Sequence, residues 1–405
     1  MTTIPDLRSD IEQVNPRIIA LRRALHRHPE LAFDEVRTAM TLAERMRALG
    51  LSVREGIGRT GVVAMLEGDR PGRTLLVRAD MDALPMEETT GHEYASTYPN
   101  RHHACGHDAH SAIVAGVAEV LARHRDHIAG RVAFVFQPAD EPMRGAKCMI
   151  EDGLLESVKP DLSLSVHVLP MAKVGQVVVQ SGPLWPSWDT VIFTISGRTP
   201  ALDAPSFDLA RVAAQVATAL YDLVEREGRS ADPVIFRVRS LMAEQRGRGE
   251  PSQAAIEVLL GRGEPSEARI EINLALYDNH LRARLLGRIE DVARAIVSAA
   301  GGLLRSEVDY ALPAVVNDAQ VTGAVDRAAR RVVGQANIIT GWRNRVADDV
   351  ALFLAAAPGC LMLLGTANPE RGITEIWHRP GFDIDEEALP LGVEILALAA
   401  LHLLQ

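Results

Sequence analysis

Two hydrophobic patterns alternate along the first half of the chain. Apolar residues recur at helical spacing between Asp6 and Leu49, whereas the runs 62–66 and 74–77 are nearly all apolar and predict buried strands. The same patterns predict further helices and strands over 110–124, 145–155, 131–136 and 162–166. Strands that alternate with helices of this length form βαβ units. The sequence therefore predicts an α/β domain with a mostly parallel sheet and helices on both faces.

The pattern changes near Trp188. Beyond it, strands are predicted over 190–196, 233–241, 254–260 and 268–277, and helices over 207–227 and 280–300. In the strand 268–277, Ile270, Ile272 and Leu274 fall on one face and polar or charged residues on the other. The order β-α-β-β-β-α predicts a small ferredoxin-like α+β layer.

From about residue 308 the α/β pattern resumes, and it ends in a helix over 387–404. A chain of 405 residues also exceeds what one hydrophobic core comfortably holds. We therefore expect a discontinuous catalytic domain, 1–187 and 306–405, interrupted by an inserted lid domain over 188–305.

Composition and charge narrow the classes of protein. The formal net charge of -10 argues against nucleic acid and anionic membranes as partners. The longest apolar stretch, 395–404, is too short to span a bilayer, and the opening MTTIPDLRSD lacks a secretory pattern. Three cysteines are an odd number, which disfavours a disulfide framework. We expect a protein of the reducing cytoplasm.

The densest group of candidate ligands is HHACGHDAH, which runs from His102 to His110. Cys105 and His107 stand two residues apart with a glycine between them, so both can turn toward one ion. Thiolate and imidazole are the ligands that a borderline-soft metal prefers. The motif alone is equally compatible with solvated or helix-capping histidines.

Other candidate ligands follow the predicted strands directly. Asp140 and Glu141 come after the strand 131–136, and His167 comes after the strand 162–166. Because ligands bind at the carboxyl ends of strands in open α/β sheets, we expect these residues to converge. Adjacent carboxylates are costly to bury without a cation. With a metal present, one can bind the ion while the other takes a proton from water. Alone, the pair would indicate only a solvated loop.

Five segments occur in a fixed order along the chain: RADMDALP, HHACGHDAH, FQPADEP, GAKCMIEDGLLE and IWHRPGFDIDE. Together they resemble the dinuclear metal-dependent amidohydrolase family of hippurate hydrolases, aminoacylases and auxin-conjugate hydrolases. The resemblance covers roughly 6–187 and 308–405. It implies a two-domain fold and hydrolysis of N-acyl amino acids or related small amides by metal-activated water. It also implies a homodimer formed through the lid, and we expect the strand 268–277 to pair with its copy across the two-fold axis.

The resemblance also implies a role for individual residues. Two divalent ions (Zn, Mn or Co) would be held by Cys105, His107, Glu141, His167 and His378. Cys105 would bridge them, with His107 and Glu141 completing one site and the other two histidines the second. Asp140 occupies the general-base position. Supporting roles fall to Asp80, Asp82, His103, Asp108 and His110, whereas the remaining histidines, His26 among them, are interpreted as surface or structural.

The chain departs from the family pattern at four places. The family has two glutamates where this chain has Asp140 and Glu141, and the lid sequence Gly-Arg-Gly-Gly-His is here Gly197-Arg198-Thr199-Pro200-Ala201. The family's Asn-Val-Ile-Pro segment has no counterpart in the Gly-, Glu- and Arg-rich stretch 246–267, and Ala275 replaces an expected arginine. A lost donor such as the lid histidine typically costs about a hundredfold in rate.

None of these departures touches the implied metal ligands, so the metal centre is better supported than the reaction. Two alternatives to the amidohydrolase therefore stay open. One is a non-catalytic, metal-bound scaffold or ligand-binding protein. The other is a hydrolase of an atypical small substrate, such as a lactam or a carbamoyl compound.

Overall fold

The computed structural model describes residues 4–197, 207–228, 232–244 and 267–405. The chain forms two compact units. The first comprises Met1–Leu184, Val315–Asn344 and Asp348–Gln405, and the second comprises Trp185–Ala314 and Arg345–Ala347. The boundary expected between 305 and 306 falls inside β11 (Gly302–Leu312), because this strand pairs with β8 (Trp188–Gly197) over its whole length. The second unit accordingly continues to Ala314.

The first unit is built on an eight-stranded sheet with the order β1-β2-β4-β3-β5-β14-β6-β13. In that order the strands are Ser52–Ile57, Gly61–Glu67, Ala129–Gln137, Arg70–Asp80, Leu162–Lys173, Gly359–Ala367, Val177–Val178 and Ile338–Ile339. The neighbours β4, β3, β5 and β14 are all parallel, while β1 and β2 join antiparallel at one edge. A separate two-stranded sheet contains β7 (Gly182–Trp185) and β12 (Val315–Asn317).

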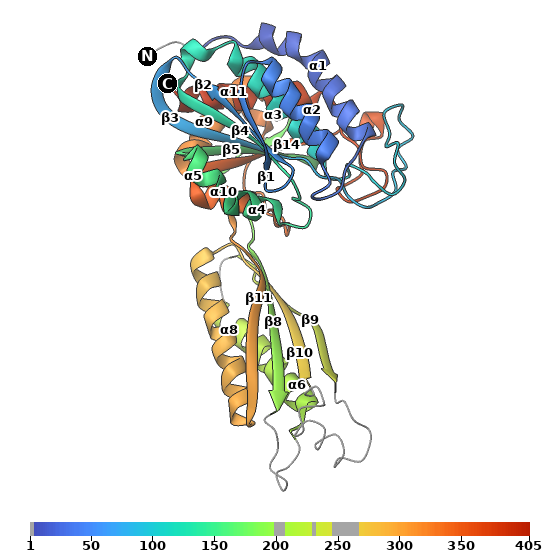
Figure 1. The fold of residues 1–405 in the computed structure, drawn as a ribbon, viewed down its shortest axis with the longest axis vertical. Helices are drawn as coiled ribbons and strands as arrows, with labels where there is room; N and C mark the ends of the chain where they lie inside the picture. The colour runs from blue at the N-terminus through green and yellow to red at the C-terminus, as the bar shows by residue number, and fades with distance from the viewer. Residues whose placement is uncertain (1–3, 198–206, 229–231, 245–266) are drawn as a thin grey trace. The chain divides into compact units, whose positions relative to one another are not determined.

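Helices cover both faces of this sheet (Figure 1). The larger core includes α1, α2, α3, α9 and α11, which are Arg8–Arg27, Val36–Ala48, His107–Ala122, Ala319–Val333 and Ala388–Leu403. The opposite face packs against α4, α5 and α10, which are Gly145–Glu151, Leu154–Val158 and Val350–Ala356. Short 3-10 turns lie at Arg125–His127, Gln335–Asn337 and Pro369–Arg371. The predicted α/β class, with a mostly parallel sheet covered on both faces, is confirmed.

The second unit has the ferredoxin-like order β-α-β-β-α-β among the described residues. Its elements are β8, α6 (Leu209–Glu227), β9 (Ile235–Glu244), β10 (Glu267–Ala275), α8 (Asn279–Ala299) and β11. The sheet is antiparallel with the order β11-β8-β10-β9. Ile270, Ile272 and Leu274 are all buried, as the alternation predicted. The predicted strand 254–260 and the segment 198–206 lie outside the described residues.

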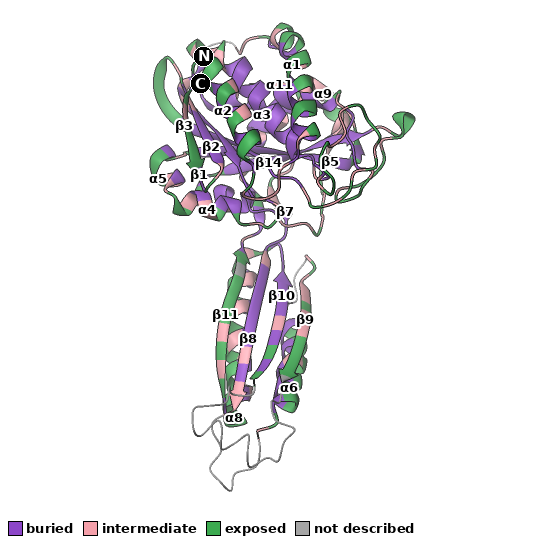
Figure 2. Cartoon of the chain, turned by 45° about the vertical axis from the view of Figure 1, so that its right-hand side comes forward, coloured by how far each residue is buried: buried purple, intermediate pink, exposed green. Residues whose placement is uncertain are grey.

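The expectation that strand 268–277 pairs with its copy is wrong. This segment is β10, and its backbone hydrogen bonds go to β8 on one side and β9 on the other. The outer strands of the described sheet are β9 and β11, and Figure 2 shows that both are more exposed than β8 and β10. An edge-to-edge contact between copies would therefore need one of the outer strands.

Two further sequence predictions concern the whole chain. Cys105, Cys148 and Cys360 are free thiols, as their odd number suggested. Within the described ranges, no helix combines the length and apolar character needed to cross a membrane.

Candidate metal centre

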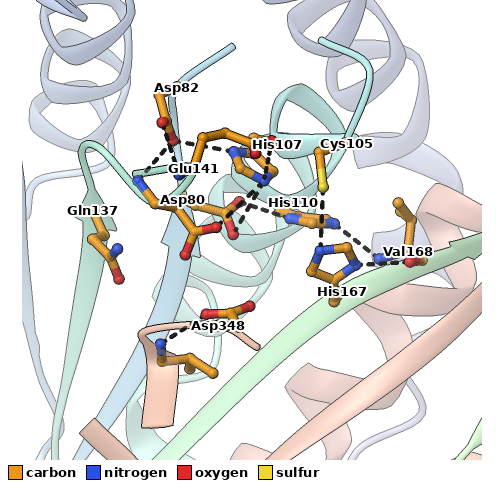
Figure 3. A network of polar contacts seen from close by, with 12 residues as sticks. Asp80, Asp82, Cys105, His107, His110, Gln137, Glu141, His167, Val168 and Asp348 are labelled. Carbon is orange, nitrogen blue, oxygen red and sulfur yellow. Dashed lines mark hydrogen bonds and ion pairs between the residues drawn. The ribbon is translucent and has the colours of Figure 1, made fainter. Parts of the chain in front are cut away.

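The five predicted ligands come together near the carboxyl ends of β3, β4 and β5. Figure 3 shows four of them, Cys105, His107, Glu141 and His167. Glu141 lies four residues after the end of β4, and His167 lies inside β5. The strand was expected to end before His167, but it continues to Lys173 because it pairs with β14 there. Its pairing with β3 stops at Ser165, so His167 lies just beyond the residues of β5 that pair with β3.

Gly106 brings Cys105 and His107 against β5. It has a φ of 86°, and a Cβ atom added there would lie 2.5 Å from Cγ2 of Val168. Only glycine combines this left-handed conformation with so close an approach. It caps α3, whose first residue is His107, so both neighbouring side chains turn toward the strand. The helix consequently begins at His107, three residues before the predicted start at 110.

The donor atoms form two groups that share one sulfur atom. Within each group, the atoms lie within 4.8 Å of one another: Cys105, His107 and His167 in the first, Cys105, Glu141 and His378 in the second. Sγ of Cys105 is 3.7 Å from Nε2 of His167, and Nε2 of His378 is 3.5 Å from Oε2 of Glu141. The resemblance had implied a different pairing, of His107 with Glu141. Nε2 of His107 does lie 3.8 Å from Oε1 of Glu141, so the two groups adjoin.

The chemistry of these donors fits a divalent cation. Nε2 of His107 and Oε1 of Glu141 are buried and have no hydrogen-bond partner among the described residues. Burial raises the pKa of Glu141 to about 8 and that of the Cys105 thiol well above its usual value. Such atoms are costly to bury unless a cation binds them. A thiolate, imidazoles and a carboxylate are the ligand types of zinc and its neighbours.

Asp82 orients one ligand and the loop that carries another. Its Oδ1 lies 3.2 Å from Nδ1 of His107, which leaves Nε2 of that ring facing the centre. Its two oxygens also accept the backbone N–H groups of Asp140 and Glu141, each at 3.0 Å. One buried carboxylate therefore fixes His107 and the Asp140–Glu141 turn together.

The backbone N–H and carbonyl groups of Val168 position three ring side chains. Its N–H donates to Nε2 of His110 at 2.8 Å. Its carbonyl oxygen accepts from Nδ1 of His167 at 2.8 Å and from Nε1 of Trp377 at 3.2 Å. His167 therefore presents Nε2 to Cys105, and the Trp377 contact anchors the residue before His378. His110 also contacts Oδ1 of Asp80 through Nδ1 at 2.7 Å, so neither of its nitrogens is free for an ion.

His378 is the most exposed of the five predicted ligands, with 55% of its side chain accessible. Its position is fixed by its own backbone and not by burial of the side chain. Its N–H donates to the carbonyl oxygen of Ala104 at 2.9 Å, and its φ is 59°, in the left-handed region. This unusual conformation for a non-glycine residue turns the side chain toward Glu141 and Cys105.

The sequence analysis missed Arg78, which lies at the centre of the buried charge network. Its guanidinium donates to Asp80 at 2.8 Å and to Gln137 at 2.9 Å, and it forms an ion pair with Asp140. Asp348 and Asp349, at the start of α10, lie 3.3 and 3.4 Å away. Burial raises the pKa of both Asp348 and Asp349 well above the usual range. A signal for Arg78 was present, because it is the one charge that interrupts the apolar run from Leu75 to Ala79.

Arg78 also controls the ionisation of Asp140. Burial alone would raise the pKa of Asp140, but the positive charge of Arg78, with smaller contributions from His107 and a hydrogen bond with Asp349, holds the pKa below its usual value. Oδ1 of Asp140 faces Arg78, while Oδ2 lies 3.8 Å from Nε2 of His107. Asp140 is therefore an ionised carboxylate with one oxygen near the predicted ligand His107.

Known proteins provide an independent comparison. Residues 76–402 match the sequence profile described as peptidase family M20/M25/M40. A probable hydrolase of Synechocystis is 34% identical and covers 98% of both chains. An N-acetylcysteine deacetylase of Bacillus subtilis is 32% identical over 96% of this chain and 97% of its own.

A solved structure agrees with the sequence matches. A Bacillus subtilis protein, described as a dinuclear metal-binding peptidase of the M20 family, superposes with a TM-score of 0.79 at 28% identity. The superposition covers 97% of this chain and 99% of that one. The resemblance read from the five sequence motifs is thus confirmed, and the chain belongs to peptidase family M20/M25/M40.

Proposed function

We propose that this metal-dependent amidohydrolase cleaves the amide bond of an N-acyl amino acid or a closely related small amide. The observation that carries the proposal is the pair of adjoining donor groups that share Cys105. The names of relatives support the substrate class, since they include the deacetylase above and an N-acyl-L-amino acid amidohydrolase of Geobacillus stearothermophilus.

The donor groups support two divalent cations, with Zn, Mn and Co the metals that this ligand set suits. In this proposal Cys105, His107 and His167 hold one ion, and Cys105, Glu141 and His378 hold the other. When bound, such ions supply Lewis acidity and lower the pKa of a water molecule toward neutrality.

Asp140 moves the proton in this proposal. Its Oδ2 faces the ligands and accepts the proton of the attacking water, and it then donates that proton to the departing amine nitrogen. Arg78 keeps the carboxylate ionised and holds Oδ1 in place, so Oδ2 has a fixed direction. Asp82 holds the backbone of the same turn.

The substrate's own carboxylate needs a partner that the altered sequence does not supply at the expected position. Ala275, at the end of β10, is buried and carries no charge, and Ala201 lies outside the described residues. We therefore include small amides without an α-carboxylate in the proposed substrate class.

The proposal is tested by measuring the metal content of the chain and its turnover of substrates with and without a carboxylate. Chain reconstituted with Zn, Mn or Co is assayed on N-acetyl and N-benzoyl amino acids and on the matching amides that lack the carboxylate. We expect turnover that depends on the metal, and its loss in Cys105→Ala. Cys148→Ala, which removes a free thiol outside both donor groups, is the matched control and should keep ions and activity. Metal-loaded chain that turns over no member of the panel would contradict the proposal.

We also propose a cytoplasmic homodimer joined through the second unit. A reducing compartment suits a site whose shared ligand is a free thiol. The outer strands carry exposed apolar side chains, with Met242 on β9 57% exposed and Leu303 on β11 53% exposed. Light scattering on wild type, Met242→Glu and Leu303→Glu would identify the strand involved, and a monomeric wild type at micromolar concentration would contradict the dimer.

A further inference from the structure

A second group of buried donors lies outside the five ligands. His26, Glu88 and His102 each direct one donor atom to a common place, and these atoms lie within 4.8 Å of one another. His26 comes from the last turn of α1, while Glu88 and His102 come from the loop between β3 and α3. The side chains of His26 and Glu88 are 0% and 3% exposed, and His102 is 0% exposed. The dinuclear centre uses none of these residues.

His102 is the unexplained member of this group. Neither of its ring nitrogens has a hydrogen-bond partner in the part of the chain that the structure describes. Buried polar atoms are normally paired, and an unpaired one costs roughly 1–3 kcal/mol. Burial also lowers the pKa of His102 to about 4, so the ring is neutral near pH 7 and offers a lone pair.

His26 is already oriented as a ligand would be. Its Nδ1 lies 2.7 Å from Oδ2 of Asp108, so Nδ1 carries the hydrogen and Nε2 faces the other members of the group. Nε2 is 3.2 Å from Oε1 of Glu88. A lone pair so close to a carboxylate is repulsive unless a proton or a metal ion stands between the two atoms.

The local charge also calls for a cation. The buried guanidinium of Arg22 pairs with Asp108 and Asp383, and the carboxylate of Glu88 lies beside His26. Glu386 also lies 3.4 Å from Arg22, but its charge is balanced by Arg23. Three negative charges and one positive charge leave a net charge of minus two. A divalent ion would balance this charge, whereas a protonated His26 would offset only half of it.

We propose that His26, Glu88 and His102 bind a third divalent cation, separate from the dinuclear centre. Two imidazoles and one carboxylate suit Zn²⁺, with water in the fourth position. Tetrahedral bonds of about 2.0–2.1 Å place ligand atoms about 3.3 Å apart. The His26–Glu88 separation of 3.2 Å already matches, and His102 needs only a small approach.

The ion has a structural role. The backbones of Leu84 and His102 pair with each other through two hydrogen bonds of 3.0 Å, which close the loop that contains Glu88. Cys105 follows three residues after His102. The third ion therefore ties the end of α1 to the segment that delivers the shared thiolate, and it stabilises the loop without taking part in the reaction.

Metal stoichiometry tests the proposal directly. Wild-type chain, saturated with Zn²⁺ and freed of excess, should hold three ions by elemental analysis, and His102→Ala should hold two. His103→Ala is the matched control, because His103 is also buried and unpartnered among the described residues but lies outside the donor group. It should keep three ions. The double variant Cys105→Ala/His378→Ala should keep one ion, and adding His102→Ala to it should remove that ion.

Two further measurements keep the test valid if an alanine variant folds poorly. Glu88→Gln preserves the side-chain shape, and we expect its third Zn²⁺ to bind at least a hundredfold more weakly in calorimetric titration. Cobalt in the third site should lack the thiolate-to-metal absorption that Cys105 gives to the dinuclear centre. A wild type that saturates at two ions, or a Glu88→Gln variant that titrates like wild type, would overturn the proposal. His26 would then be an imidazolium between Asp108 and Glu88.

Discussion

The guanidinium of Arg78 lies against the carboxylate of Asp140, inside a network where both side chains are largely removed from water. The contact couples the stability of the fold to the proton acceptor of the proposed reaction. A carboxylate held by an arginine stays ionised but binds a proton weakly.

Asp140→Ala should leave the ions bound and lower kcat by about 10² to 10⁴, the usual contribution of a general base. Asp140→Glu should lower kcat less, because it restores the carboxylate at a longer reach. Steady-state kinetics with metal analysis of each variant measures both effects. Unchanged kcat in Asp140→Ala would remove Asp140 from the mechanism.

Arg78→Met should destabilise the chain by about 3–5 kcal/mol, because it leaves several buried carboxylates without their cation. Urea unfolding measures the loss. Arg8→Met is the control, since Arg8 pairs with Asp6 at the exposed start of α1 and should barely change the midpoint. Equal midpoints for the two variants would show that the network is not stabilised through Arg78.

Gly106→Ala should cost about 1–2 kcal/mol for the left-handed backbone and about 1–3 kcal/mol more for the contact with Val168. It should also weaken metal binding, because Cys105 and His107 flank it. Gly91→Ala separates the two causes: Gly91 has a φ of 72° but no atom within 4 Å of an added Cβ. Equal losses in the two variants would show that the contact with Val168 contributes nothing.

Metal binding should release protons and strengthen as pH rises. The pKa of Glu141 in the metal-free chain is about 8, so at pH 7 this carboxyl must lose a proton before it binds an ion. Affinity should therefore increase from pH 6 toward pH 8 and then level off with respect to this group. Calorimetry in buffers of different ionisation enthalpy measures the number of protons released on metal binding. This number should be about one lower for Glu141→Gln than for wild type. Equal counts would contradict the raised pKa.

The sequence predicted local features well. The convergence of candidate ligands that directly follow an apolar strand, such as Glu141 after β4, could be predicted because strand ends in a parallel sheet share one edge. Most of the helices and strands for which the patterns gave a range also lie near their observed bounds, whereas elements such as β1, α9 and β14 were given no range. Each of these signals lies within a few residues of the feature that it predicts.

What the sequence analysis missed depends on contacts between distant segments. Strand order placed β10 inside its sheet, although its alternating pattern is equally compatible with an edge. Arg78 meets Asp348 across 270 residues, and His26 meets Glu88 across 62. A single charged or polar residue has no periodicity, so nothing in its neighbourhood indicated its partner.

The N–H and carbonyl groups of Val168 hold three ring side chains, so the orientation of these rings depends partly on the main chain. Alanine scanning would overlook this position, because Val168→Ala keeps both the N–H and the carbonyl group. Replacing the amide N–H of Val168 with an ester oxygen would remove the hydrogen bond to His110, and an ester at the following bond would weaken the carbonyl acceptor of His167 and Trp377. Backbone substitution, and not side-chain mutagenesis, is therefore the way to measure how much the main chain contributes to the orientation of His167.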